Sequence, residues 1–133
     1  MKTIVAIMED EEKIFLLRRA NTSAFEGFWA LPGGKIDYRE DEKEAIKREV
    51  TEETNLNFEL LHFFGRYEER FPQYGWSADT NVFYGSFSGN VRTNEESSDY
   101  GWFSLEEILK MDLAFHHKRI IRDFYRFTKN RVK

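Results

Sequence analysis

Three acidic residues, Glu49, Glu52 and Glu53, lie close together near the middle of the 133-residue chain. Residues 40–53 around them contain no Gly or Pro and are rich in Glu, Lys, Arg and Ala, a composition that predicts a helix. On such a helix the three carboxylates fall within an arc of about 100°. Like charges at these spacings repel one another, and the helix dipole disfavours anions near the C-terminal end. Helix stability therefore does not explain this arrangement.

A divalent cation does explain it, because hard ions such as Mg²⁺ bind carboxylate oxygens. Ala45 shares the arc and Val50 borders it, so the glutamates lie beside the side of the helix that faces the core. The alternative is a solvated acidic face, in which Arg48 pairs with Glu44 or Glu52 and relieves part of the repulsion. Both interpretations suit this segment when it is taken alone.

The longer segment from Gly34 to Leu56 resembles the Nudix box, the motif of the Nudix (MutT-like) hydrolases. That box has a Gly, five residues, a Glu, seven residues and then Arg-Glu-aliphatic-X-Glu-Glu-X-Gly-aliphatic. The matching residues are Gly34, Glu40, Arg48, Glu49, Val50, Glu52, Glu53 and Leu56. Asn55 stands where the family has Gly, and Asn is the next best residue for a left-handed helix end.

Two further segments extend the resemblance to about residues 3–127. Phe28 to Gly34 is similar to the family's W-x-L-P-G-G lead-in, and Trp102 to Ile108 is similar to its W-F-x-x-x-E-L segment. The resemblance implies an α/β (α+β) fold, the Nudix α/β/α sandwich, in which a mixed β-sheet lies between helices and carries a loop–helix–loop catalytic motif. Asp37-Tyr38-Arg39 replaces the more usual Glu-Pro-Gly, which alters the loop without removing a ligand.

The resemblance also implies a metal site. Glu49, Glu52 and Glu53 are expected to bind one or more Mg²⁺ ions, for which Mn²⁺ can substitute, and the Gly33 carbonyl often joins them. The expected reaction is attack of water on phosphorus in the diphosphate linkage of a nucleoside diphosphate derivative, with a (d)NTP or related nucleotide as the favoured substrate. The metal would neutralise the diphosphate and lower the pKa of the attacking water.

Other residues are expected to assist this chemistry. Arg48 and Glu40 would orient the metal ligands through ion pairing. The general base varies within the family, and four carboxylates are open for that role here: Glu49, Glu53, Glu96 and Asp99.

Other substrates are open, and so is a function without catalysis. ADP-ribose, nucleotide sugars and dinucleoside polyphosphates stay open, because Pro72 and Tyr74 lie near positions typical of different subfamilies. A non-catalytic nucleotide-binding regulator is the alternative from another class. Such relatives usually lose glutamates of the box, whereas this chain keeps all of them.

Several residues outside the box are expected near the substrate. Arg19 and Arg18 end a predicted strand, and a guanidinium fork suits a phosphate, although a solvated strand end is an equal alternative. Trp29 is a candidate for stacking on a base, with packing in the core as the favoured alternative. His116 and His117 could contact phosphate, but capping or surface positions are preferred for them.

The elements that must position these residues follow from hydrophobic patterning. Strands are predicted at 3–8 and 14–19, paired as a hairpin, and at 58–69, 80–88 and 100–103. Ser104 with Glu107 forms a capping box for a short helix that ends near Leu109. Residues 116–131 form an amphipathic helix. Strands on both sides of one central helix, followed by helices, indicate a sandwich of helices around a mixed sheet.

The last helix is basic. Its cationic side chains, and those just after it, are Lys118, Arg119, Arg122, Arg126, Lys129, Arg131 and Lys133. A solvated face of an amphipathic helix explains them better than RNA binding does.

Composition limits the remaining possibilities. The chain has no Cys, which excludes disulfides, thiolate metal sites and Cys nucleophiles, and its formal net charge of −4 does not favour nucleic acid or an anionic membrane. The apolar run at residues 4–8 is too short for a signal peptide or a membrane span. We therefore expect one domain over residues 1–133, cytoplasmic, monomeric or homodimeric. Its partner would be a nucleotide-type small molecule, with neither membrane nor nucleic acid involved.

Overall fold

The first sheet carries the central strand of the protein. The structure is a computed structural model that describes residues 1–131, with side chains up to residue 129. In this sheet the strand order is β5-β1-β7-β6, where β1 and β7 run parallel and the other pairs are antiparallel. The strands are β1 (Lys2–Ile7), β5 (Gly33–Lys35), β6 (Asn57–Phe71) and β7 (Trp76–Ser88). The sheet is therefore mixed, as expected.

The second sheet is antiparallel and is built around β3. Strand β3 pairs with β2 and β4 and, along its full length, with β8. The strands are β2 (Glu9–Asp10), β3 (Lys13–Arg19), β4 (Trp29–Ala30) and β8 (Ser97–Ser104). The β layer thus consists of two four-stranded sheets, and residue Met8 connects one to the other.

The hairpin predicted between residues 3–8 and 14–19 is wrong in its pairing. Strand β1 pairs with β7 and β5, and only the two-residue strand β2 forms a hairpin with β3. The reason is burial on both faces. Ile4–Met8 and Ile14–Leu17 are continuously buried, which is typical of strands in the interior of a layer rather than of a half-exposed hairpin.

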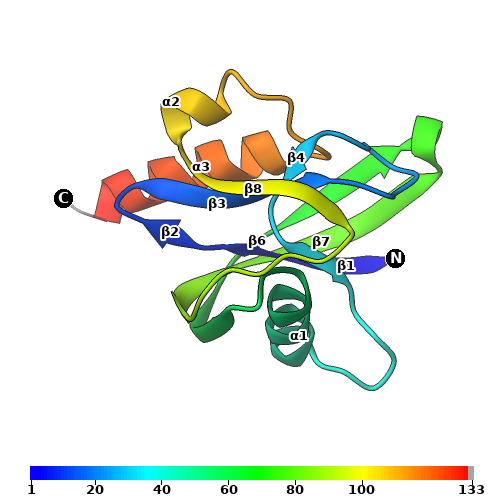
Figure 1. Ribbon diagram of the computed structural model, residues 1–133, viewed down its shortest axis with the longest axis horizontal. Coiled ribbons are helices and arrows are strands. Elements are labelled where there is room, and N and C mark those ends of the chain that lie inside the picture. Colours follow the sequence, from blue (N-terminus) through cyan, green and yellow to red (C-terminus); the bar gives the residue numbers. More distant parts are fainter. Residues whose placement is uncertain (132–133) are drawn as a thin grey trace.

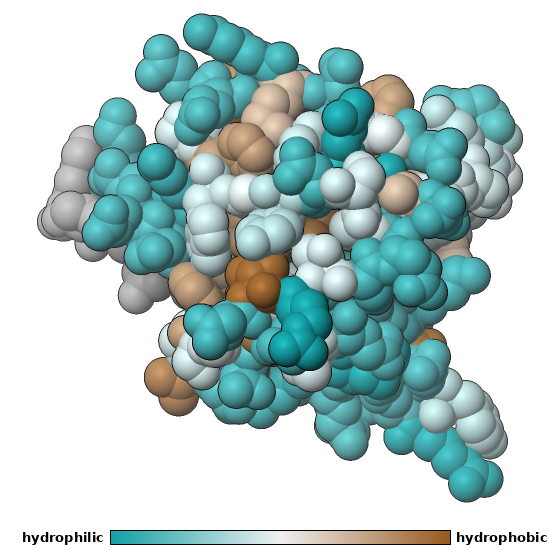
Figure 2. Space-filling model, in the orientation of Figure 1, coloured by the Kyte–Doolittle hydropathy of each residue, from teal (hydrophilic) through white to brown (hydrophobic). Residues whose placement is uncertain are grey.

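Helices cover both faces of the β layer, which confirms the α/β/α sandwich (Figure 1). Alternate residues of β1 point to opposite faces: Ile4 and Ala6 pack with α1 (Glu42–Thr54), and Val5 and Ile7 pack with α3 (His117–Arg131). The short helix α2 (Leu105–Ile108) lies on the α3 side. In Figure 2 hydrophilic side chains cover most of the visible face, and hydrophobic surface is confined to small patches.

Helix α1 begins two residues later than predicted. Asp41 is its N-cap, and a capping box joins Asp41 to Glu44, so Glu40 lies before the helix. The predicted end is confirmed: Asn55 adopts the left-handed conformation with φ 66° and donates its N–H to the Thr51 carbonyl.

The remaining elements agree with the patterning and extend it. Strands β6 and β7 form a long hairpin closed by the 3₁₀ turn η1 (Pro72–Tyr74). The capping box of Ser104 with Glu107 is present, and α3 begins at His117, one residue after the predicted start. Of the predicted basic residues, Lys133 and the side chain of Arg131 lie outside the described part. Within residues 1–131, no helix has the length and apolar character needed to cross a membrane.

Candidate active site

Two carboxylates of α1 lie against strand β5. The buried residues Ala45, Ile46 and Val50 anchor the helix on the β layer, and this orientation turns Glu49 and Glu53 toward the strand. The N–H of Gly33 donates a hydrogen bond to Glu53 Oε1 over 3.1 Å. The contact joins the lead-in segment of the predicted motif directly to one of its glutamates.

The glycines of β5 make this close approach possible. A Cβ added at Gly34 would lie 2.6 Å from the Glu49 carboxyl carbon, and a Cβ at Gly33 would lie 2.1 Å from the Ile4 carbonyl oxygen. Any side chain at either position would displace the carboxylate or the neighbouring strand. These positions require glycine because of space, since neither has a positive φ.

Arg48 connects the acidic residues of the site. Its guanidinium binds Glu40 through two hydrogen bonds of 2.6 and 3.0 Å, and its Nη1 donates to Glu49 at 3.0 Å and to Glu52 at 3.2 Å. The hydrogen bonds with Glu40 raise the pKa of Arg48, and they lower the pKa of Glu40. The structure thus brings together four residues predicted for the site, with Arg48 at their centre.

Glu49 and Glu53 form a carboxyl pair. The two residues lie one turn apart on α1, and both carboxyl groups lie against the glycines of β5. Burial raises the pKa of both groups, and it raises the pKa of Glu53 well above its usual range, with the Glu49 charge as a further cause. A divalent cation bound by these carboxylates would offset the cost of holding two acidic groups close together, so the pair fits Mg²⁺ or Mn²⁺.

Glu52 does not converge with the pair. Its side chain is exposed and is held by Arg48. Within the described chain, no three histidine or acidic side chains already surround one point in the manner of a metal site. Binding of one ion by all three predicted glutamates would require Glu52 to leave Arg48.

A small polar cavity opens beside the carboxyl pair. It has a volume of about 250 Å³, and its wall includes Glu53, Gly33, Arg19, Thr22 and Glu96. Arg19 is held in that wall by hydrogen bonds to the Ala24 carbonyl and to Thr22 Oγ1, both of 3.0 Å. Burial lowers the pKa of Arg19, and the charges of Glu53 and Glu96 oppose that effect. The charged side chains in the cavity wall are therefore one guanidinium, that of Arg19, and two carboxyl groups, those of Glu53 and Glu96.

A β-bulge in β3 distinguishes Arg19 from Arg18, two residues that the sequence left as candidates for binding substrate. The register of β3 with β8 pairs Arg18 with Asp99 and then shifts, so that Arg19 pairs with Ser97. Arg19 and Glu96 line the cavity, whereas Arg18 is exposed and donates to the Gly27 carbonyl. Asp99 is exposed, and its carboxylate accepts the Tyr100 N–H.

Trp29 is partly buried, packs against the core and does not line the cavity. Its ring centroid lies 5.0 Å from that of Phe103, and its backbone bridges to Leu113. Other aromatic residues pack closely around Phe25 and Phe115 and form a separate cluster. The rings of that cluster belong to Phe25, Phe28, Phe71, Tyr74, Trp76 and Phe115.

His117 was not predicted as a buried contact. It is 3% exposed, and its Nδ1 accepts a hydrogen bond from the Leu31 N–H over 3.0 Å. Burial lowers the pKa of His117 to about 3, with the charges of Arg19 and His116 as further causes, so the imidazole is neutral. No local sequence pattern could have predicted this contact, because Leu31 lies 86 residues before His117.

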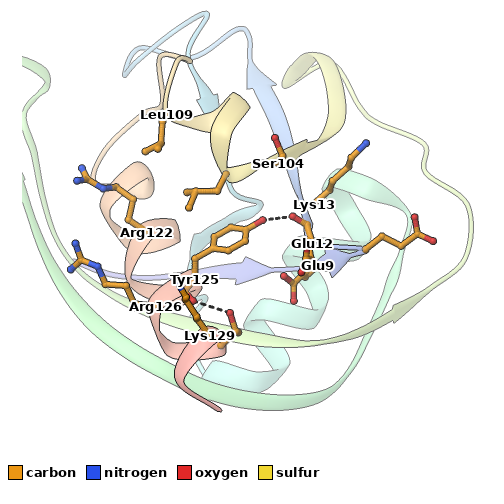
Figure 3. Close-up of a pocket in the computed structure, with 12 residues that line it drawn as sticks. Glu9, Glu12, Lys13, Ser104, Leu109, Arg122, Tyr125, Arg126 and Lys129 are labelled. Atoms are coloured by element: carbon orange, nitrogen blue, oxygen red, sulfur yellow. Dashed lines mark hydrogen bonds between the residues drawn. The ribbon is translucent and has the colours of Figure 1, made fainter. Parts of the chain in front are cut away.

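A larger groove lies away from the carboxyl pair. It has a volume of about 1160 Å³ and is bounded by the turn between β2 and β3, by α2 and by α3 (Figure 3). Glu9 and Glu12 lie on one side and Arg122 and Arg126 on the other, with Tyr125 hydrogen-bonded to the Glu12 carbonyl. No residue of α1 lines this groove, so it is not part of the candidate active site.

Known proteins share this sequence and fold. The sequence profile of the NUDIX domain matches residues 1–124. The chain is 32% identical over 123 residues to an ADP-ribose pyrophosphatase of Methanocaldococcus jannaschii, covering 91% of this chain and 70% of the relative. It is 31% identical over 124 residues to the nucleoside triphosphatase NudI of Klebsiella pneumoniae, covering 84% and 88%.

A solved structure agrees with these relatives. The crystal structure of a MutT protein from Methanosarcina mazei superimposes with a TM-score of 0.81 at 31% identity, covering 100% of this chain and 96% of that one. The profile match spans nearly the whole chain and includes both the carboxyl pair and the cavity beside it. The chain therefore belongs to the Nudix hydrolase family.

Proposed function

We propose that this protein is a Mg²⁺-dependent pyrophosphohydrolase that cleaves the diphosphate linkage of a nucleoside diphosphate derivative, with a (d)NTP or related nucleotide as the favoured substrate. The observation that carries the proposal is the Glu49–Glu53 carboxyl pair. It lies against two glycines, is tied to Arg48 and opens onto a polar cavity that contains Arg19.

The metal would be held by Glu49, Glu53 and Glu52, the last after release from Arg48, with the Gly33 carbonyl as a further ligand. When bound, Mg²⁺ would neutralise the diphosphate and lower the pKa of the attacking water. Arg48, itself bound by Glu40, would keep Glu49 in place, because a guanidinium that binds several acidic groups at once limits the rotamers of each.

Arg19 is the residue proposed to bind the substrate phosphate or sugar. Its guanidinium is already fixed by Thr22 and by the Ala24 carbonyl, so little conformational entropy is lost when it binds an anion. It lies in the same cavity as Glu53, which would place a bound phosphate next to the carboxyl pair. Arg18 and Trp29 lie outside that cavity and have no such role in this proposal.

Glu96 is the favoured general base of the four carboxylates considered. It lines the cavity, and its charge acts on both Arg19 and Glu53. A carboxylate there could take the proton of a water that attacks phosphorus, while the box glutamates hold the metal. Asp99 is less favoured for this role because it does not line the cavity and is the register partner of Arg18.

The relatives and the cavity support a substrate class, the nucleoside diphosphate derivatives, and not one compound within it. The two relatives named above are an ADP-ribose pyrophosphatase and a nucleoside triphosphatase, and both names describe cleavage next to a nucleotide phosphate. The cavity wall contains Arg19, Asn21, Thr22 and Ser97, groups that suit phosphate and sugar oxygens. ADP-ribose, nucleotide sugars and dinucleoside polyphosphates are the alternatives within the class.

A substrate panel tests the proposal. Purified protein is incubated with Mg²⁺ and with nucleoside triphosphates, ADP-ribose, nucleotide sugars and dinucleoside polyphosphates, and products are separated by anion-exchange chromatography. We expect cleavage between phosphates that is abolished by EDTA and by Glu53→Gln. Tight nucleotide binding with no turnover, indifferent to Mg²⁺, would instead support a regulatory module and contradict the proposal.

A further inference from the structure

The loop that carries Glu96 is fastened on two sides. This acidic loop, residues 89–96, connects β7 to β8. On one side the Arg92 N–H donates to the Thr54 carbonyl at the end of α1 over 2.9 Å. On the other side the Ala20 N–H donates to the Glu96 carbonyl, also over 2.9 Å. The loop therefore bridges the C-terminal end of the carboxylate helix and the segment that follows β3.

One side chain joins the acidic loop to the helix next to the carboxyl pair. Asn94 Nδ2 donates to the Glu52 carbonyl over 3.0 Å, and Asn94 Oδ1 accepts the Glu96 N–H over 2.9 Å. The Glu52 carbonyl belongs to the last turn of α1, whose carbonyls have no partner within the helix. A planar amide that satisfies both groups fixes the Glu96 backbone relative to α1.

Glu96 itself has little else to fix its carboxylate. The side chain lines the cavity and makes no hydrogen bond within the described residues. Glu53 is the residue next to Glu52, whose carbonyl Asn94 holds, so the position of Glu96 relative to Glu53 depends on the loop backbone. A small rotation of residues 94–96 would move the carboxylate out of reach of a water at the carboxyl pair.

We propose that Asn94 is a positioning residue for the hydrolytic reaction, acting through Glu96 by holding the acidic loop to the last turn of α1. The inference rests on the proposed function, since it requires Glu96 to act as base or as supplementary metal ligand. Asn94 touches neither the cavity nor the carboxyl groups, so its effect is indirect.

A double-mutant cycle tests this. Residues that orient a catalytic group typically contribute about 10–100-fold to activity. We expect Asn94→Ala to lower kcat at least about tenfold, with less than about a twofold change in KM, when Glu96 is present. In the Glu96→Gln background, the same substitution should lower kcat less than about twofold, because the group it positions has been removed.

Asn90→Ala is the matched control. Asn90 lies in the same loop, its side chain is exposed, and only its carbonyl is used, as acceptor for Asn55 Nδ2. It should keep full activity. Equal losses from Asn94→Ala in both backgrounds, or no loss at all, would overturn the positioning role.

Two further measurements separate this inference from general damage to the fold. The thermal midpoint of each variant is compared with the assay temperature. If Asn94→Ala does not fold, Asn94→Asp replaces it, since Asp keeps the acceptor for the Glu96 N–H and loses the donor to Glu52. The expected loss in kcat is then the same, and an unchanged kcat would overturn the proposal. Loss of turnover in Glu53→Gln, assayed alongside, would show that the proposed hydrolysis stands even where Asn94 proves unimportant.

Discussion

The imidazole of His117 accepts a hydrogen bond from the Leu31 backbone N–H, joining the start of α3 to the segment that leads into β5. The backbone supports the same junction, because Trp29 donates to the Asp112 carbonyl and Ala114 donates to the Trp29 carbonyl. The glycines at the carboxyl pair are therefore tied to the last helix as well as to β1. Residues 112–117 serve as a structural clamp on the site.

This clamp should make the protein sensitive to acid. The pKa of His117 is about 3 in the folded protein and 6.5 for the unperturbed side chain. Between these values the unfolded chain binds a proton that the folded chain excludes, so stability is lost as pH falls from about 6.5 toward 3. We expect the free energy of unfolding, measured with urea, to be about 1–3 kcal/mol lower at pH 4.5 than at pH 7 because of this group. His117→Gln should remove most of that difference, and an unchanged pH dependence in the variant would contradict the assignment.

Glu53→Gln should nearly abolish turnover and leave the fold intact. The amide can still accept the Gly33 N–H and can donate to Glu49, so the contacts of the carboxyl pair survive without its charge. We expect kcat to fall more than about 100-fold, beyond the range for residues that only orient ligands. Without metal, the unfolding free energy should stay equal or rise, because a repulsive buried charge is removed. A wild-type rate would remove the proposed metal site.

Gly34→Ala should impair activity through space alone. The new Cβ would meet the Glu49 carboxyl at 2.6 Å, so either the carboxylate or β5 must shift. We expect a destabilisation of about 1–3 kcal/mol and a clear loss of kcat. Gly65→Ala is the matched control, since its Cβ would meet only Tyr67 at 3.6 Å, an ordinary contact. The thermal midpoint and kcat of both variants test this. Equal midpoints and equal kcat values in the two variants would argue against the steric explanation.

Arg48→Lys should lower activity although the charge is kept. Lysine cannot reproduce the two parallel hydrogen bonds to Glu40 and at the same time hold Glu49 and Glu52. We expect kcat to fall about 10–100-fold. The apparent Mg²⁺ requirement should also change, because Glu52 is released. Titration of activity with Mg²⁺ measures both effects, and identical curves for the two proteins would contradict the role given to Arg48.

The two arginines that end β3 should differ sharply. Arg19→Ala removes the cation of the cavity and should lower kcat/KM about tenfold or more, as expected for one lost charge-assisted contact of about 1.5–3 kcal/mol. Arg18→Ala removes an exposed side chain bound to the Gly27 carbonyl and should change the rate little. Steady-state kinetics on both variants compare them directly. Similar losses would contradict the assignment of Arg19, and not Arg18, to the substrate site.

Local signals predicted α1 better than any other part of the structure. The helix, its left-handed end at Asn55 and the capping box at Ser104 all follow from residues within a few positions of one another. The true start was missed because the good helix formers extend back to Glu40, although Asp41 with Glu44 three residues later has the spacing of a capping box. The distinction matters for Glu40, which reaches Arg48 from outside the helix.

Contacts between segments far apart in the sequence could not be predicted from such local signals. The parallel pairing of β1 with β7 depends on how the layers close, and adjacent strand predictions favoured a hairpin. The bulge that separates Arg19 from Arg18, and thus Glu96 from Asp99, leaves no local pattern. The same is true of Asn94 and His117, whose partners lie 42 and 86 residues away.

Strand β1 has no face in contact with solvent over most of its length, since Ile4 and Ala6 serve one layer and Val5 and Ile7 the other. A replacement at any of these positions disturbs the packing under a helix, and Ile4 and Val5 are also the register partners of Gly34 and Gly33. Freedom to retune the enzyme toward new substrates therefore resides in residues 20–22, which line the cavity and do not belong to the buried core.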